Sequence, residues 1–213
     1  GSLGFLTTLL FGAYFAYIGQ YTYAVMAFAL TGSLLSFLLY NFPPAKIFMG
    51  DTGSLLLGLV NSILVIKFIN LSTATNVAMP LEAAPAIGFA ILMIPLADTL
   101  RVFSQRLLAR RSPFSPDRNH IHHFLLDLGF SHRKITLTCV SVNILFIAMA
   151  VGLRHLGTTV VMAILFGSAL LLISLVYFLR QKTSSLPVEE KAAPEVIKQP
   201  KIITLVTDSM EAE

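Results

Sequence analysis

Charged side chains are scarce in this sequence. They make up 12% of its 213 residues, whereas 55% of the residues are hydrophobic and the mean hydropathy is +0.78. A soluble domain of this length carries about 25% charged residues. The composition therefore excludes a soluble domain and indicates an integral membrane protein. The single cysteine, Cys139, can form no disulfide within the chain, and we interpret it as a packing residue.

Hydrophobic residues gather in blocks close to the length of about 20 residues that a helix needs to cross a bilayer. The period-2 alternation that is typical of membrane β-barrels is absent, so these blocks are predicted to be helices. The expected fold is therefore all-α, a polytopic bundle of about six transmembrane helices. The predicted spans are 3–18, 21–40, 55–69, 85–103, 135–153 and 158–179.

Lysine and arginine are distributed unevenly around the predicted spans. Most of them lie in the segment 104–134 and after residue 179, whereas Lys67 and Arg154 fall near the opposite side. Because positively charged loops remain in the cytoplasm, the segment 104–134 is predicted to be cytoplasmic. Counting the predicted spans back from it places the segment 41–54 in the cytoplasm too. The pI of about 9.3 follows from this bias, and it requires no nucleic acid as a partner.

The end of the chain differs from the rest in composition. Residues 181–213 are rich in proline, glutamate, lysine and alanine, a composition that predicts a disordered cytoplasmic tail. The predicted organisation is a transmembrane region over residues 1–180 followed by this tail, to which we assign no function.

The stretch NFPPAKIFMGDTGS, residues 41–54, interrupts the apolar pattern. Its two prolines disfavour helix, and glycines on either side of Asp51 permit unusual backbone angles. The stretch therefore predicts a tight turn and then a helix start, where backbone amides form a partly positive pocket. Two interpretations of Asp51 are open. It is either a helix N-cap or a ligand of a magnesium ion, and in the second case water and a substrate phosphate would complete the coordination of the ion.

A second polar stretch, RRSPFSPDRNHIHHFLLDLGFSHRK, occupies residues 110–134. Hydrophobic residues at helical spacing within it predict a short amphipathic helix that lies at the membrane interface. Three interpretations are open for the polar residues at its start: a solvated basic end, a zinc site, or a site for a nucleotide and its phosphates. These residues are Asp117, Arg118, His120, His122 and His123.

Asp98 lies near the end of the fourth predicted span, in the stretch IPLADTLR. An ionisable residue in a span is a functional candidate. Arg101 follows one turn later, however, so an ion pair on the helix surface explains Asp98 equally well. Pro95 in the same stretch is predicted to kink the helix.

Both polar stretches resemble motifs of the polyprenyl-phosphate N-acetylhexosamine-1-phosphate transferases, glycosyltransferase family 4. NFPPAKIFMGDTGSLLLG is similar to the family stretch whose Phe-Met-Gly-Asp aspartate is a catalytic magnesium ligand and whose asparagine, ten residues earlier, is an active-site residue. The resemblance assigns these roles to Asp51 and Asn41. SPFSPDRNHIHH is similar to the family's histidine motif, which helps form the nucleotide-sugar pocket. The implied substrate-binding residues are Asp117, Arg118, His120, His122 and His123.

The resemblance implies transfer of N-acetylglucosamine 1-phosphate, or a related hexosamine phosphate, from a UDP-sugar to undecaprenyl phosphate, with release of UMP. The His-x-His-His form resembles the N-acetylglucosamine branch of the family. Mg²⁺ is the implied cofactor, with Mn²⁺ as an alternative. The implied partners are the UDP-sugar, the polyprenyl phosphate and the bilayer, and a homodimer is left open. Such an enzyme starts cell-envelope polysaccharide synthesis at the cytoplasmic face of the inner membrane.

Part of the family pattern is missing from the sequence. The family's Asp-Asp-x-x-Asp motif and a later Asn/Asp-rich stretch do not occur, and no Asp-Asp pair is present. The expectation is that residues 1–180 form the C-terminal half of a longer transferase domain. The alternative is a non-catalytic membrane remnant or assembly subunit, or a small transporter, although the spans carry few of the polar groups that transport needs.

We therefore expect the 213-residue chain to be inactive by itself, because it lacks the paired carboxylates that would complete the metal site. The measurement is UMP release from UDP-N-acetylglucosamine by the purified chain, with polyprenyl phosphate and Mg²⁺ present. A reaction without the chain sets the background, and clear turnover above it would contradict this expectation.

Overall fold

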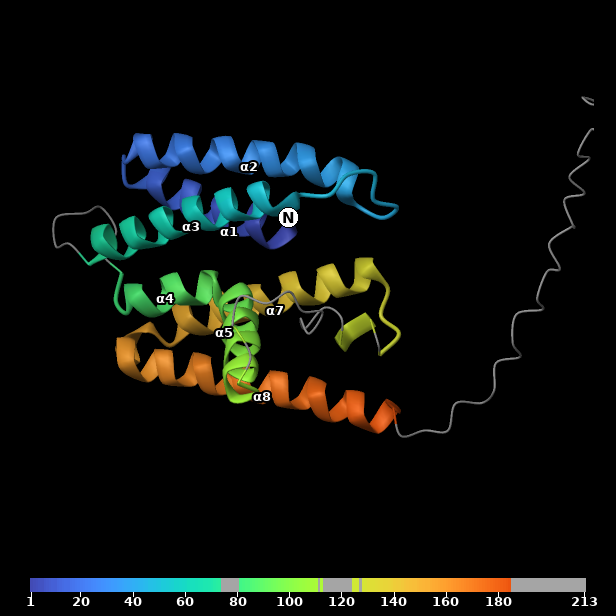
Figure 1. Ribbon diagram of the computed structural model, residues 1–213. Helices are drawn as coiled ribbons and strands as arrows, with labels where there is room; N and C mark the ends of the chain where they lie inside the picture. Colours follow the sequence, from blue (N-terminus) through green and yellow to red (C-terminus); the bar gives the residue numbers. More distant parts are fainter. Residues whose placement is uncertain (74–80, 111, 113–123, 127, 185–213) are drawn as a thin grey trace, which may run out of the picture.

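The computed structural model describes residues 1–73, 81–110, 112, 124–126 and 128–184. All the regular structure in these ranges is helical, which confirms the all-α prediction (Figure 1). The helices are α1 (Ser2–Tyr17), α2 (Tyr21–Asn41), α3 (Gly50–Ser72), α4 (Ala84–Ile91), α5 (Met93–Leu108), α7 (His132–Gly152), the short 3₁₀ helix η1 (Arg154–Leu156) and α8 (Thr158–Ser184).

All six predicted spans are helical, but not all of them are long and straight enough to cross a membrane. Helices α2, α3, α7 and α8 are long and apolar enough to cross a membrane. The pair α4 and α5 is bent by 75°, so it forms a broken span or a re-entrant loop. Helix α1 has 16 residues and extends about 24 Å, less than the roughly 30 Å of a hydrocarbon core. The protein is a multi-pass membrane protein with four clear crossings among the described residues.

The helices form two groups that share one core. In Figure 1, α1, α2 and α3 lie on one side, and α4, α7 and α8 lie on the other. The core between them includes Phe11 and Phe15 from α1, Leu64 from α3, Phe146 from α7 and Leu165 from α8, all almost fully buried. These packed side chains hold the two groups together, while other large apolar side chains remain exposed on the outside of the bundle, where a bilayer would cover them.

Glycines allow the helices to approach closely, as the following two contacts illustrate. A methyl group added at Gly12 of α1 would lie 2.9 Å from the ring of Phe28 on α2. One added at Gly88 of α4 would lie 3.1 Å from Val65 on α3. Small residues serve the same purpose in membrane bundles generally, because dispersion contacts rather than the hydrophobic effect drive helices together in lipid.

Polar side chains inside the bundle tie α1 to its two neighbours. The hydroxyl oxygen of Thr7 lies 2.9 Å from Asn61 Oδ1 on α3, and that of Thr8 lies 2.9 Å from the hydroxyl oxygen of Thr31 on α2. All four residues are buried. Such contacts contribute about 0.6 kcal/mol each in a membrane protein, so their main effect is to set the relative positions of the three helices.

The break between α4 and α5 has a chemical cause. Pro95 has no N–H to donate to the carbonyl of Ile91, and a proline ring also clashes with that carbonyl in a regular helix. The bend accordingly falls at Leu92, three residues before the proline at which it was predicted. Asn143 of α7 is completely buried beside the break, where its Nδ2 donates to Ile91 O at 3.0 Å and its Oδ1 accepts from Ile94 N at 3.3 Å. One side chain thus satisfies backbone groups that the break would leave unpaired in lipid.

We expect Asn143→Leu to lower the free energy of unfolding by about 1–3 kcal/mol, because leucine has a similar size but cannot pair with the two backbone groups. The measurement is unfolding of the purified protein in detergent. Asn70→Leu is the matched control, since Asn70 is exposed near the end of α3. Equal stability of the two variants would contradict this account of the break.

Candidate active site

Asp51 lies in the first turn of α3. The N-cap position of this helix is Met49, and the helix begins at Gly50, whose φ of +66° suits glycine. Asp51 is therefore not the N-cap, and of its two interpretations the capping role is wrong. Its exposed side chain lies where the helix macrodipole favours negative charge. The carboxylate is accordingly available to a ligand from outside the helix.

Asn41 is the last residue of α2 and organises the loop that leads to Asp51. Its Nδ2 donates a hydrogen bond of 2.8 Å to the carbonyl of Ile47. In the same loop the Lys46 N–H donates to the carbonyl of Tyr40 at 2.8 Å. The two bonds fold the loop back onto the end of α2. Asn41 therefore helps fix the conformation of the loop that leads into α3. Its predicted catalytic role stays a prediction.

The two polar stretches of the sequence meet at one end of the bundle. Arg133, in the first turn of α7, donates a hydrogen bond of 2.9 Å to the carbonyl of Pro43 in the loop between α2 and α3. In Figure 1 this loop and the start of α7 lie at the same end, opposite the turn between α7 and α8. The prediction that the two stretches share one face of the membrane fits this contact.

The histidine motif lies outside the described residues, and so do its predicted ligands Asp117, Arg118, His120, His122 and His123. The tail 185–213 also lies outside them. The structure does describe both flanks of the motif. Residues 124–126, which follow it, are helical, in agreement with the predicted amphipathic helix. The preceding flank is the end of α5.

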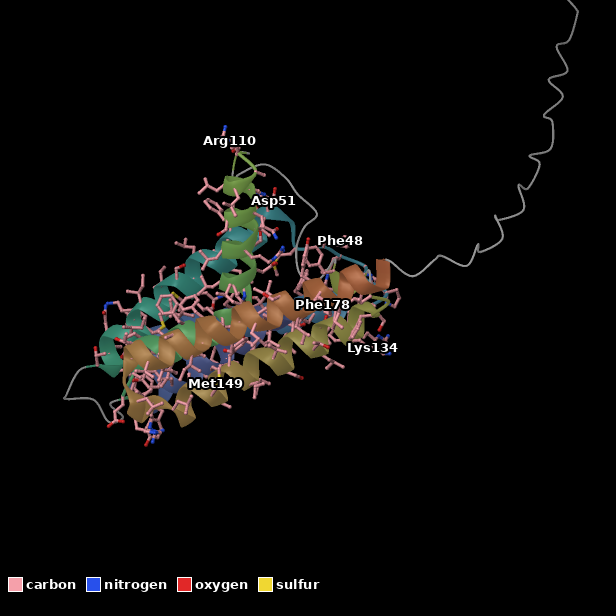
Figure 2. The ribbon with its side chains drawn as sticks, turned by 90° about the horizontal axis from the view of Figure 1, so that it is seen from below. Phe48, Asp51, Arg110, Lys134, Met149 and Phe178 are labelled. Carbon is pink, nitrogen blue, oxygen red and sulfur yellow. The ribbon has the colours of Figure 1, made fainter. Side chains whose placement is uncertain are left out.

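Helix α5 carries Asp98 and Arg101. Figure 2 shows α5 projecting from the bundle, with Arg110 at its far end and Asp51 on the same side of the molecule. Arg101 Nη2 lies 2.9 Å from Asp98 Oδ1, so the ion pair that was one of two interpretations of Asp98 is confirmed. The guanidinium carbon of Arg101 also lies 4.8 Å from the centre of the Phe124 ring, just after the histidine motif. Neither the sequence spacing nor any motif indicated this second contact.

A cavity of about 360 Å³ lies between α1, α3 and α5. Its lining includes Ser54 near the start of α3, Asn61 further along that helix and Leu92 at the break. Its lining is mostly apolar, with a few hydroxyl and amide groups. Because Ser54 in its lining lies one turn after the exposed carboxylate of Asp51, this largely apolar cavity suits a molecule with a charged head and an apolar tail.

The residues around Asp51 limit the kind of metal site that they could form. Within the described parts of the chain, no group of three or more His, Cys, Asp or Glu side chains is placed to hold a metal ion. Zinc is therefore not supported by these residues, since it takes three or four protein ligands. Magnesium remains compatible with them, because it binds through one or two carboxylates and completes its coordination with water and substrate phosphate.

Comparison with known proteins gives one family. The sequence profile of glycosyl transferase family 4 matches residues 1–69. A decaprenyl-phosphate N-acetylglucosaminephosphotransferase of Mycobacterium leprae is 39% identical over 131 residues, which cover 55% of this chain and 30% of the relative. An undecaprenyl-phosphate alpha-N-acetylglucosaminyl 1-phosphate transferase of Escherichia coli O157:H7 is 32% identical over 181 residues, which cover 81% of this chain and 47% of the relative. The chain thus spans about half the length, or less, of these curated relatives. No solved structure matches it significantly.

The shared end of the bundle predicts a labelling pattern. In a Cys139→Ala background, cysteines introduced at Lys46 and Arg111 should respond alike to a membrane-impermeant thiol reagent in intact cells. Arg154→Cys is the control and should respond in the opposite way, because Arg154 lies in the turn between α7 and α8 at the other end. If the cysteines at positions 46 and 111 respond differently, the two polar stretches do not share a face of the membrane.

Proposed function

Because the chain belongs to glycosyl transferase family 4, we propose that it takes part in transferring N-acetylglucosamine 1-phosphate from UDP-N-acetylglucosamine to a polyprenyl phosphate. The observation that carries this proposal is the exposed Asp51 carboxylate at the start of α3, one turn from a mostly apolar cavity. The names of the relatives support the acceptor and the transferred group. They describe transferases and give no support to a transporter.

In the proposed reaction, a phosphate oxygen of the polyprenyl phosphate attacks the β-phosphorus of the UDP-sugar. A new P–O bond forms to the lipid phosphate, and the bond between the β-phosphorus and the bridging oxygen breaks. The electron pair leaves with UMP, and the other product is polyprenyl-diphospho-N-acetylglucosamine. Phosphoryl transfer of this kind depends mainly on positioning and on neutralising charge.

The position of Asp51 supports a role for a divalent cation in the proposed reaction. The start of α3 attracts anions through its free backbone amides and its macrodipole. An ionised carboxylate in the same turn would, however, repel a diphosphate that binds there. Mg²⁺, or Mn²⁺ in its place, held by Asp51 and the substrate phosphates, would remove this repulsion and stabilise the charge that develops on UMP.

The cavity between α1, α3 and α5 is the proposed place for the part of the lipid next to its phosphate. Because Ser54 in its lining lies one turn after Asp51, a lipid in this cavity would have its phosphate near that carboxylate, and the apolar lining suits isoprene units. The donor would be bound by the histidine motif, through Asp117, Arg118, His120, His122 and His123. The excess of lysine and arginine in the segments at this end supports the proposal that it faces the cytoplasm, and the proposed location is the inner membrane.

Substitution of Asp51 tests the metal role. The assay uses a chimera in which this chain replaces the aligned region of the Escherichia coli relative, so that activity can be measured. Asp51→Asn keeps the shape of the side chain and removes its charge, so we expect turnover to fall by at least about a hundredfold with an unchanged melting temperature. Glu82→Gln is the matched control, because Glu82 is an exposed carboxylate in the connection between α3 and α4, at the other end.

The donor residues should respond differently in the same chimera. Arg118→Ala or His122→Ala should mainly raise the KM for the UDP-sugar, while the dependence on Mg²⁺ stays unchanged. Near-normal turnover of a well-folded Asp51→Asn variant would reject the metal role. An inactive chimera with unmodified Asp51 would count against the proposed reaction itself.

A further inference from the structure

The first turns of α3, which carry Asp51, receive little support from the other described helices. The first buried residue of α3 is Asn61, whereas the helix begins at Gly50. At 1.5 Å per residue, Asp51 lies roughly 15 Å along the helix from that buried position. No side chain of the described residues caps this end of the helix, where Met49 occupies the N-cap position. The position of the first turn therefore depends on the loop that leads into it.

That loop, residues 42–49, is folded as one unit by hydrogen bonds. Most of its side chains are exposed, so packing contributes little to its position. Asn41 Nδ2 donates to Ile47 O at 2.8 Å, and the Lys46 N–H donates to Tyr40 O at 2.8 Å. Both bonds attach the loop to the end of α2. Only two residues separate Ile47 from the first residue of α3, so a movement of the loop would also move the start of that helix.

Arg133 joins this loop to a different helix. Its Nη2 donates to Pro43 O at 2.9 Å, across 90 positions of the sequence. Of the hydrogen bonds that the described residues make with the loop, this is the one that comes from α7. The backbone of Arg133 is itself well fixed. Ser131 before it caps α7 by accepting from the Lys134 N–H, and Ile135 after it is buried.

We propose that Arg133 is a positioning residue, which fixes the start of α3, and with it Asp51, relative to α7 through its bond to Pro43. The proposal rests on the proposed function, in which Asp51 binds the divalent cation. Arg133 itself need not touch the cation or a substrate. The contact is a single bond to one carbonyl oxygen, so a lysine ammonium can also make it, whereas a methionine side chain cannot.

The position of the loop can be measured in the whole chain in lipid nanodiscs. In a Cys139→Ala background, spin labels at Ala45 of the loop and Leu175 of α8, both exposed, give the distribution of distances between the loop and the bundle. Arg133→Met should shift or broaden this distribution, and Arg133→Lys should leave it unchanged. A second pair of labels, at Leu35 of α2 and Leu175, should give the same distances in every variant, because neither label lies in the loop.

The matched control is Lys134→Met. Lys134 is the next residue in the first turn of α7, it is exposed, and its side chain makes no hydrogen bond or ion pair with the described part of the chain. The substitution removes one positive charge from the same place and keeps the bond between Arg133 and Pro43. The distances should therefore stay as they are in the unmodified chain.

The effect on Asp51 is measured in the chimera described above, as the Mg²⁺ concentration that gives half-maximal turnover. Arg133→Met should raise this concentration about tenfold with an unchanged Tm, which is the usual effect of losing a group that positions a metal ligand. Removing a positive charge would by itself strengthen cation binding, so the loss of charge cannot cause such a rise. Arg133→Lys should restore the original value, and Lys134→Met should not raise it.

The outcomes separate the bond from the function on which the proposal rests. Unchanged distances in Arg133→Met would show that the bond does not hold the loop, and an unchanged Mg²⁺ concentration would overturn the positioning role. Equal effects of Arg133→Met and Lys134→Met would also overturn it, because Lys134 has no bond to the loop. If the unmodified chimera is inactive, the proposed function fails and the inference about Asp51 falls with it. The distances need no substrate, so they would still show whether Arg133 holds the loop.

Discussion

The pairing of backbone groups at the break between α4 and α5 is the interaction on which the arrangement of the site depends. In a bilayer an unpaired N–H or C=O group costs several kcal/mol, so a helix can bend by 75° only where another group replaces the lost bonds. Asn143 does this from α7 with a single amide, which both donates and accepts. The direction of α5, and with it the position of Asp98 and Arg101, follows from this pairing.

The residues of the candidate site that the structure describes lie at one end of the bundle. Asn41 closes the loop before α3, and Arg133 joins that loop to the start of α7. The histidine motif lies between α5 and α7 in the chain, and Phe124, which follows it, contacts Arg101 of α5. A site made from two separate stretches is therefore supported by hydrogen bonds in the loops and by the bend between α4 and α5.

Much of the fold could be predicted from the sequence. Lipid imposes a length and an apolar composition on each crossing, and the sequence shows them directly for α2, α3, α7 and α8. The positions of the two polar stretches could also be predicted from the sequence. Charged residues are costly in lipid, so a segment that contains several of them is expected to lie outside the spans. The bend was predicted from Pro95, but its place at Leu92 was not. Proline disturbs the turn before it, and the exact residue depends on which partner replaces the lost bonds.

The sequence by itself determined the membrane class, the helical fold and the residue types at the candidate site, because these follow from composition and local spacing. It left Asp51 open between a cap and a ligand, since both roles use a carboxylate at a helix start. The tertiary structure alone decided that Met49 takes the cap position, that Asn143 pairs with the broken helix and that Arg101 lies on Phe124. The two side-chain contacts join residues 23 or more positions apart, and such pairs are set by how the helices pack, which local spacing does not encode.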